Sequence, residues 1–316
     1  MTGYIEEHWP CVLKIIRKNV GFLPSSGRDV ARHILNVRGK RLRPALLLLS
    51  GQAFGLEPQK LFPLAAAVEL AHTASLLHDD LEDESLLRRG RPSAHTVFGP
   101  KGALLAGDSL LALAMCICTS EYGPDICKCF SSALLKTASG QIKELSKVDG
   151  LYEYFDIILL KTGSLMGCSC EMAGLLAKQK KEICLALREF GENLGAAYQI
   201  ADDWKDFAPS EVTGKSQCRD LLKGNATLPV RLFMKSLAPE AGNNFMADLQ
   251  KQLSSGESCM EIYNAMQAQG IGSHISSHIN HFLKKAEKNL SFIPESKQKD
   301  ILIHIAEQTR NAQQGF

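Results

Sequence analysis

Residues 64–83 read LAAAVELAHTASLLHDDLED, a stretch that is apolar on most faces and ends in a group of carboxylates. A helix that is apolar nearly all round belongs at the centre of a helical protein, because no side of it is suited to water. Asp79 and Asp83 stand four residues apart, so they lie one turn apart on one face of this helix. Carboxylates on a buried helix are costly unless something neutralises them, and the stretch therefore predicts a cation-binding site at the end of a central helix.

The rest of the sequence has the same helical character. The run 45–49, ALLLL, is apolar on every side, and residues 103–118 are apolar on most faces. Segments rich in Ala, Leu, Lys, Glu and Gln alternate with short Gly/Pro breaks, whereas alternating Val/Ile/Thr runs bounded by Asn-Gly or Asp-Gly turns do not occur. No linker, low-complexity stretch or repeat divides the chain. We therefore expect one all-α domain over residues 1–316, a single large helical domain of roughly ten or more helices.

Composition sets limits on location and partners. The 316 residues are 45% hydrophobic and 22% charged, and 36 Lys and Arg against 34 Asp and Glu leave a formal net charge of +2. A nearly balanced charge argues against a nucleic-acid partner. The ten cysteines accompany no secretion signal near the N-terminus, so we expect reduced thiols and a cytoplasmic protein. The most apolar run, 109–118, is about half the length of a membrane-spanning helix, so we expect no transmembrane segment and membrane contact only at the surface.

A second acidic cluster lies far along the chain, where residues 199–206 read QIADDWKD. Asp202 and Asp206 are again one helical turn apart, and small apolar residues lead into them. Two such clusters in like contexts indicate hard divalent cations. Carboxylate oxygens suit Mg²⁺, which keeps several waters and is usually shared with substrate phosphates. The sequence thus predicts a Mg²⁺-bridged diphosphate between facing helices.

Cationic residues flank the first cluster on both sides. Arg88, Arg89 and Arg91 follow it, and residues 38–44, RGKRLRP, precede it. Arginine binds diphosphate oxygens in a bidentate manner, and a solvated basic loop is the alternative interpretation of either group. Together they hold more cations than one Mg²⁺-bound diphosphate needs. We infer a second diphosphate that is bound mainly by Arg and Lys.

The order of these motifs resembles that of the trans-isoprenyl diphosphate synthases, the head-to-tail polyprenyl synthetase family. The resemblance runs from about residue 38 to about residue 229, and the order of the motifs carries it more than any one of them. In chain order the motifs are GKRLRP (39–44), HTASLLHDD (72–80), RRG (88–90), GD (107–108), GQIKE (140–144), KTG (161–163), the second aspartate cluster, GK (214–215) and residues 220–229.

This resemblance implies an isoprenoid synthase fold in which the two aspartate clusters face each other across a central cavity between helices. It implies that Asp79, Asp83 and Arg88 lie at the allylic diphosphate. Mg²⁺ would be held by Asp79, Asp83 and Asp202. The positions that match those holding isopentenyl diphosphate are Lys40, Arg43, His72 and Arg89. The positions that match those at the reacting end of the allylic chain and at a further diphosphate contact are Lys161, Thr162, Gln199 and Lys215.

The implied activity is that of a Mg²⁺-dependent prenyltransferase, an all-trans polyprenyl diphosphate synthase that condenses isopentenyl diphosphate head-to-tail onto an allylic diphosphate. The allylic C–O bond breaks toward a carbocation, which the hydroxyl of Thr162 and the amide oxygen of Gln199 could stabilise. The double bond of isopentenyl diphosphate attacks, and a proton then leaves to the departing diphosphate. The resemblance also implies a homodimer, and transient membrane contact for product release is a separate expectation.

Two other functions compete with this one. A terpene cyclase or head-to-head condensing enzyme shares the ionisation chemistry, but it would lack the basic segment with Lys40, Arg43 and His72. A non-catalytic subunit of a heteromeric synthase would be expected to have damaged aspartate clusters, and both are intact here. This last alternative rests on two departures from the family's pattern. Cys218 stands where the family usually has Gly, in a loop where φ > 0 would favour Gly, and Asn225 stands where it usually has Lys.

Product length depends on the helix before the first aspartate cluster, which is expected to form one wall of the channel for the growing chain. Each helical turn covers ~5 Å, about one isoprene unit. In the family a bulky aromatic one turn before the motif stops elongation, whereas this chain has Ala74, Ser75 and, further back, Ala71. We therefore expect geranylgeranyl diphosphate or a longer product. The alternative is a shorter product, farnesyl or geranylgeranyl diphosphate, if another helix closes the channel early through Met115 or Leu111.

Overall fold

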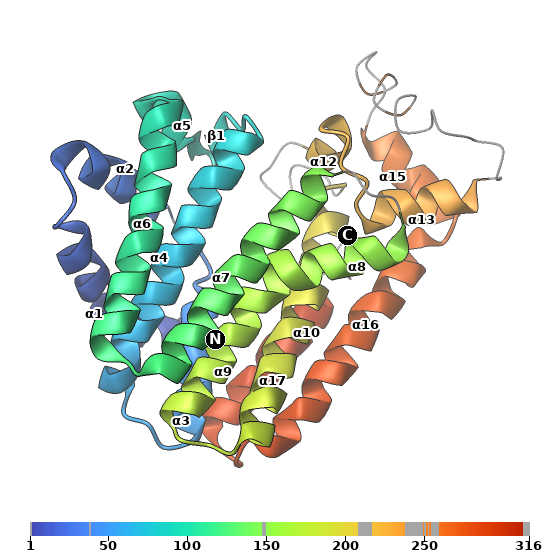
Figure 1. The fold of residues 1–316 in the computed structure, drawn as a ribbon. Coiled ribbons are helices and arrows are strands. Elements are labelled where there is room, and N and C mark those ends of the chain that lie inside the picture. The colour runs from blue at the N-terminus through green and yellow to red at the C-terminus, as the bar shows by residue number, and fades with distance from the viewer. Residues whose placement is uncertain are drawn as a thin grey trace. The chain divides into compact units, whose positions relative to one another are not determined.

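The computed structural model describes residues 2–37, 39–146, 150–207, 217–237 and 259–311, together with the single residues 249, 251 and 253. Lys215 lies outside these residues. Helices form nearly all the regular structure of the described chain, and the two-residue strands β1 (Leu87–Arg88) and β2 (Arg91–Pro92) are the exception (Figure 1). The all-α fold class predicted from the sequence is confirmed.

Two compact units divide the chain. The first consists of Met1–Leu135, Leu165–Gly191 and Asn289–His304. The second consists of Lys136–Ser164, Glu192–Lys288 and Ile305–Phe316. Each unit is thus assembled from separate stretches of sequence, and a single domain over residues 1–316 stays a prediction.

The described helices fall into three groups. Those of the first unit are α1 (Thr2–Val20), α2 (Ser25–Leu35), α3 (Leu42–Ala53), α4 (Pro58–Glu82), α5 (Ala94–Phe98), α6 (Pro100–Glu121) and the short 3-10 helix η2 (Leu290–Phe292). Those of the second unit are α8 (Leu151–Ile158), the π-helical turn η1 (Leu159–Gly163), α12 (Arg219–Leu222), α13 (Leu228–Ser236) and α15 (Cys259–Ala268). Helices with residues in both units are α7 (Pro124–Leu145), α9 (Ser164–Leu176), α10 (Lys181–Lys205), α16 (Ile271–Asn289) and α17 (Lys297–Asn311).

Two prolines and a tyrosine shape the first turns of α4. Pro58 occupies the first turn, where a missing N–H leaves no helical hydrogen bond unmade. Pro63 lies inside the helix, where its ring disturbs the bonding of the preceding turn. The hydroxyl of Tyr122 compensates, because it accepts the backbone N–H of Leu64 at 3.1 Å and donates to the carbonyl of Lys60 at 2.8 Å. The C-terminal end of α6 thereby holds the start of α4.

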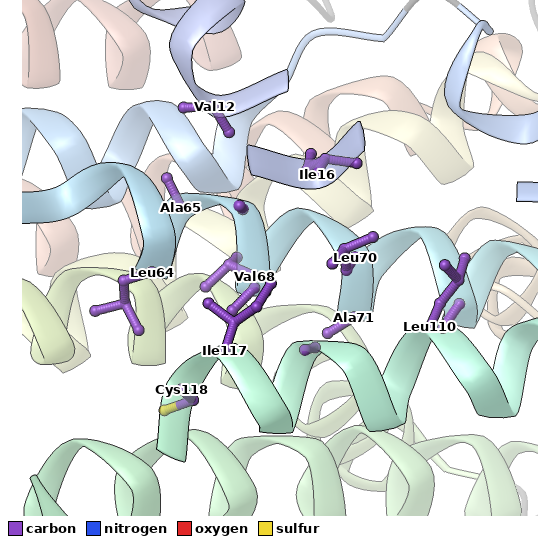
Figure 2. Close-up of a cluster of buried hydrophobic side chains, with 14 of the residues drawn as sticks. Val12, Ile16, Leu64, Ala65, Val68, Leu70, Ala71, Leu110, Ile117 and Cys118 are labelled. Carbon is purple, nitrogen blue, oxygen red and sulfur yellow. The ribbon is translucent and has the colours of Figure 1, made fainter. Parts of the chain in front are cut away.

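The hydrophobic core of the first unit surrounds α4. The side chains of Leu64 and Val68 are fully buried, and α4 packs against α1, α3 and α6. Figure 2 shows Val12 and Ile16 of α1 on one side of α4 and Ile117 of α6 on the other. Burial on nearly every side agrees with the sequence-based expectation of a central helix, and it leaves one face of the C-terminal half of α4 accessible.

Helices α4 and α6 are both long and apolar enough to cross a membrane, judged by length and composition alone. The core helices of soluble proteins pass the same test, and 67% of the apolar window of α4 and 44% of that of α6 are buried inside the protein. Helix α6 has 22 residues, so the run 109–118 is only part of a longer apolar helix. The run is about half the length of a membrane-spanning helix, whereas the complete helix α6 is long enough, so the expected absence of a transmembrane segment stays a prediction.

Leu64→Ala should remove a fully buried side chain from this core and lower the free energy of unfolding by about 2–5 kcal/mol. Denaturant unfolding followed by circular dichroism measures the change. Leu86→Ala is the matched control, because Leu86 is largely exposed, and it should change the free energy of unfolding by less than about 0.5 kcal/mol. Equal destabilisation by the two variants would contradict the placement of Leu64 in the core.

Candidate functional site

The accessible face of α4 carries the first aspartate cluster. His72, Ser75, Leu76 and Asp79 are half-buried, and Asp83, at the C-terminal end of the helix, is exposed. Intervals of three and four residues relate these positions, which keeps them on one side of a helix. The structure thus places Asp79 and Asp83 on a common face, as their spacing predicts.

Asp80 is turned into the protein. It is 1% exposed, and its Oδ1 accepts a hydrogen bond from Arg88 Nε at 2.7 Å together with a second one from Arg88 Nη2. Its Oδ2 is buried and has no hydrogen-bond partner among the described residues. The ion pair neutralises the buried carboxylate and fixes the position of the guanidinium group. Sequence reasoning gave Asp80 no role. The Asp79-Asp80 doublet could have indicated one, because neighbouring positions on a helix point in different directions and one of the two acids must therefore face another way.

A tight hairpin carries Arg88 and Arg89. Strands β1 and β2 pair antiparallel, and the two turn residues, Arg89 and Gly90, have φ of 52° and 76°. Positive φ at both central positions is the type I′ geometry that suits two-residue hairpins. The turn places Arg89 against Gly39, where an added Cβ would lie 2.4 Å from Arg89 Nη1. The glycine of the basic segment therefore makes room for the guanidinium group.

Arg41 is a structural cation. Its Nη1 pairs with the buried carboxylate of Glu69, and its Nη2 donates to the carbonyls of Leu35 at 3.1 Å and Val37 at 3.0 Å. The guanidinium carbon lies 4.5 Å from the ring centre of Trp9. These contacts show that Arg41 stabilises the fold. The spacing of the cations in the sequence could not distinguish this role of Arg41 from the roles of its cationic neighbours.

His72 lies among cations. Burial and the guanidinium groups of Arg43 and Arg89, followed by those of two further arginines, hold the pKa of His72 well below its ordinary value of 6.5. His72 is therefore neutral near pH 7 and can share hydrogen bonds with an anion without adding charge. Arg43, Arg89 and the neutral His72 are three of the four residues expected at isopentenyl diphosphate. We call this group the cationic cluster after its two arginines. The fourth, Lys40, directly follows Gly39 and is exposed.

In the second unit, a chain of hydrogen bonds runs from Thr162 to Tyr154. Thr162 Oγ1 donates to Gln199 Oε1 at 2.9 Å, and Gln199 Nε2 donates to Asp203 Oδ1 at 2.8 Å. Tyr154 OH donates to Asp203 Oδ2 at 2.6 Å. Asp203 is 5% exposed, and burial, helped by the nearby charge of Asp220, raises the pKa of its carboxyl well above the ordinary value. The chain fixes Thr162 and Gln199, the two residues expected at the reacting end of the allylic substrate.

Lys161 and Thr162 belong to the π-helical turn η1, a kind of irregularity that is frequent at functional sites. A Cβ added at Gly140 of α7 would lie 2.6 Å from the backbone nitrogen of Lys161, so the missing side chain lets α7 approach the turn. Lys161 Nζ forms an ion pair with Glu144, one turn further along α7. The GQIKE and KTG motifs are therefore in direct contact.

The acids of the second cluster have different surroundings. Asp202 is exposed, whereas the side chain of Asp206 is 4% exposed. Asp206 Oδ2 accepts the backbone N–H of Asp220 at 2.9 Å, and its Oδ1 lies 3.5 Å from Arg219 Nε, so Asp206 anchors α12. Asp220 is an acid of this site that sequence reasoning missed, although residues 220–229 were recognised as a motif. Burial, followed by the proximity of Asp206, raises the pKa of Asp220 to about 7.

A disulfide joins Cys218, directly before α12, to Cys259 at the start of α15, with their Cα atoms 6.0 Å apart. The expectation that all ten cysteines are reduced is therefore wrong for this pair, whereas the other eight are free thiols. The two residues are 41 positions apart, so composition could not reveal the pairing. Cys218 has φ of 53°, the left-handed conformation in which Gly is favoured. Asn225, the other departure, donates its backbone N–H to the carbonyl of Asp220 at 2.8 Å.

The residues expected to set product length differ in their surroundings. Ala71 and Ala74 are buried in the core of the first unit. Ser75 lies on the accessible face of α4 and donates its hydroxyl hydrogen to the carbonyl of His72 at 2.9 Å. Leu76, which sequence reasoning did not weigh, is a bulky side chain on that face. The two residues of α6 named as possible stops, Leu111 and Met115, are partly buried against the core.

Metal binding at these carboxylates would have to be shared with a substrate. Among the described residues, no three His, Cys, Asp or Glu side chains converge as a complete set of metal ligands. Mg²⁺ that binds a diphosphate needs only one or two carboxylates from the protein. Asp79, Asp83 and Asp202 are at least partly accessible, whereas Asp80 and Asp203 are buried and hydrogen-bonded to protein partners. The cavity expected between the two clusters stays a prediction.

Comparison with known proteins identifies the family. The polyprenyl synthetase family model matches residues 25–266. A prenyl transferase from Cyanophora paradoxa is 38% identical over 255 residues, which cover 77% of this chain and 77% of that protein. A geranylgeranyl pyrophosphate synthase from Geoglobus acetivorans is 31% identical over 290 residues, covering 88% of each chain.

A solved structure extends the likeness to the whole fold. The crystal structure of a polyprenyl synthase from Caulobacter crescentus, complexed with calcium and isoprenyl diphosphate, matches with a TM-score of 0.88 and 27% identity. The match covers 97% of this chain and 95% of that one. The chain belongs to the polyprenyl synthetase family.

Proposed function

We propose that the protein is a Mg²⁺-dependent prenyltransferase that condenses isopentenyl diphosphate head-to-tail onto an allylic diphosphate. Its product would be geranylgeranyl diphosphate or a longer all-trans polyprenyl diphosphate. One observation supports this above all: the first unit carries two different sets of groups that suit a diphosphate. The accessible carboxylates of Asp79 and Asp83, beside Arg88, suit a metal-bound diphosphate, whereas the cationic cluster suits one bound without metal. Two substrates that each carry a diphosphate account for both sets.

The allylic substrate would bind at the accessible acids. Asp79, Asp83 and Asp202 would hold Mg²⁺, which when bound stabilises negative charge on the departing diphosphate as a Lewis acid. Arg88 adds a positive charge that Asp80 already holds in place, so little reorganisation is needed while the C–O bond breaks. The related Caulobacter enzyme was crystallised with calcium, and the choice of Mg²⁺ here follows from the chemistry of carboxylate and phosphate oxygens.

Isopentenyl diphosphate would bind at the cationic cluster, with Lys40 as a fourth contact. The guanidinium groups of Arg43 and Arg89 can each form paired hydrogen bonds with phosphate oxygens. Neutral His72 supplies a hydrogen bond without adding to the repulsion among the arginines. Charge would thus hold only the diphosphate end, which leaves the double bond of the substrate unencumbered for attack.

Thr162 and Gln199 would stabilise the allylic carbocation. The hydroxyl hydrogen of Thr162 is donated to Gln199, so the lone pairs of Thr162 Oγ1 remain available to a positive charge. Asp203 accepts from Gln199 Nε2 and keeps the amide in one orientation. The new C–C bond forms when the isopentenyl double bond attacks the cation, and the proton released from the adjacent carbon passes to the departing diphosphate.

We also propose a homodimer in the cytoplasm. The exposed side chains of Leu104 and Leu105 on α6 give an apolar surface that a second copy of the chain could cover, and light scattering of the purified protein tests this.

The cysteines bear on the proposed cytoplasmic location. The eight free cysteines favour a reducing compartment. The Cys218–Cys259 disulfide is of the kind that oxidising compartments favour, so cell fractionation is the direct test.

The purified protein alone should convert isopentenyl diphosphate and an allylic starter into geranylgeranyl diphosphate or longer products. Dimethylallyl, geranyl and farnesyl diphosphates, each supplied with Mg²⁺, test this by product mass. Ser75→Phe should shorten the product because it adds a ring to the accessible face of α4, whereas Ala74→Phe should overpack the core and destabilise the protein by about 1–3 kcal/mol. Farnesyl diphosphate as the sole product would contradict the predicted length. No product with any starter would favour the non-catalytic subunit.

Asp79→Asn and Asp202→Asn should each lower kcat/KM by about a hundredfold or more, because both acids are accessible and serve one leaving group. The double variant should lose less than the product of the two single losses, since residues that act as a unit are not additive. Glu82→Gln, an exposed neighbour of the first cluster, is the control and should retain activity. Fully additive losses in steady-state kinetics would contradict a shared diphosphate.

Binding of isopentenyl diphosphate near pH 6 should be accompanied by proton uptake at His72. Burial and the nearby arginines hold the pKa of His72 low. A bound diphosphate offsets the charge of the arginines, so the pKa rises and the imidazole takes up a proton as the pH falls toward 6. Calorimetry in two buffers of different ionisation enthalpy counts the protons taken up. His72→Gln should lower this count, and an unchanged count would show that His72 does not sense the ligand.

A further inference from the structure

A cavity of about 310 Å³ lies between α1 and α2 in the first unit, away from both aspartate clusters in the sequence. Its lining includes Leu13, Arg17 and Val20 of α1 and Arg28, Arg32 and Leu35 of α2. In each helix the lining positions follow one another at intervals of four and three residues, so one face of each helix contributes. Val20 and Leu35 are buried, so the lining combines apolar side chains with three arginines.

The charge lining this cavity is almost unopposed. Arg32 lies 3.7 Å from Asp29, but both side chains are more than half exposed, so the pair is weak. Arg17 and Arg28 have no ion pair within the described part of the chain. Residues 14–32 contain five cations and one acid, whereas the whole chain has a formal net charge of only +2. Like charges that share a hollow repel one another, and a bound anion would relieve that repulsion.

An exposed aromatic ring lies between these cations in the sequence. Phe22, in the turn that joins α1 to α2, is 74% exposed, which is unusual for so large an apolar side chain. The next residue, Leu23, packs against the core of the first unit and anchors the turn. The backbone N–H of Phe22 donates to Asn19 at 3.0 Å and that of Leu23 to Val20 at 3.1 Å. The turn is therefore ordered, and it holds the ring of Phe22 outward.

We propose that this region, the α1–α2 tip formed by Arg17, Lys18, Phe22, Arg28 and Arg32, docks the protein on an anionic phospholipid membrane. The ring of Phe22 would enter the interfacial layer, where aromatic side chains are favoured, and the cations would contact lipid phosphates. The cavity, which three arginines line together with Val20 and Leu35, would receive one phosphate headgroup. Figure 1 shows α1 and α2 in dark blue.

The reason for docking rests on the proposed function, because a polyprenyl diphosphate carries a chain that partitions into a bilayer. The binding itself does not depend on catalysis. A free phosphate would account for the arginines and not for the exposed ring. A second copy of the tip would bring two cationic surfaces together, so a membrane is the occupant that suits both the charge and Phe22.

Flotation of the full-length protein with vesicles tests the proposal. Vesicles of phosphatidylcholine with about one-quarter phosphatidylglycerol should bind the protein at least about tenfold more strongly than neutral vesicles, and about 0.5 M salt should weaken the binding severalfold. Phe22→Ser and the double variant Arg17→Gln/Arg28→Gln should each weaken binding about fivefold or more. Phe292→Ser and Lys101→Gln are the matched controls, because both residues are exposed elsewhere in the first unit, and they should bind as the unchanged protein does.

Several results would overturn the proposal: no preference for anionic vesicles, equal losses in the control variants, or unchanged binding by Phe22→Ser. If millimolar inorganic phosphate competes with the vesicles, and the Phe22→Ser variant binds as the unchanged protein does, the region is a site for a soluble anion and not a membrane-docking surface. Circular dichroism and prenyl transfer with soluble starters should be unchanged in the tip variants. Vesicle binding by a protein without prenyl transfer would leave the docking surface in place and remove the proposed function.

Discussion

The buried ion pair between Asp80 and Arg88 is the constraint on which the first site depends. Asp80 lies inside the protein at the end of α4, and a carboxylate there is tolerated because Arg88 neutralises it. That requirement brings the β1–β2 hairpin against α4 and fixes one cation beside the accessible face. Asp79 and Asp83 lie on the accessible face of α4, Asp79 half-buried and Asp83 exposed. An element that stabilises the fold thus also places a cation where the proposed function needs one for a diphosphate.

The second unit likewise has one accessible acid beside one buried acid. Of the doublet Asp202-Asp203, the first acid is exposed and the second is 5% exposed and hydrogen-bonded to Gln199 and Tyr154. Successive residues on a helix point about 100° apart, so a doublet near the edge of a buried surface sends one acid outward and one inward. In both clusters the outward acid is suited to a metal, and the inward acid positions another residue of the site. The doubled aspartates therefore have two functions, which the spacing of four residues alone does not express.

The sequence predicted the parts of this arrangement that follow from periodicity. The apolar run 64–77 had to be a central helix, and the interval between Asp79 and Asp83 had to place them on one face. The inward roles of Asp80 and Asp203 depend on Arg88, Gln199 and Tyr154, whose approach is a matter of tertiary packing. The sequence also could not show that Ala74 lies in the core and Ser75 on the accessible face, because adjacent small residues look alike in sequence. The disulfide between Cys218 and Cys259 joins two helix starts that no local pattern connects.

The proposed function requires that the outward acids of both clusters hold metal on a single substrate diphosphate. Crystals grown with Mn²⁺ and an allylic thiolodiphosphate, which cannot ionise readily, would reveal the metal by its anomalous scattering. We expect peaks within bonding distance of Asp79 or Asp83 and of Asp202, with oxygens of the same analogue as shared ligands. An analogue bound without metal at these carboxylates, or metal bound only at other residues, would contradict it.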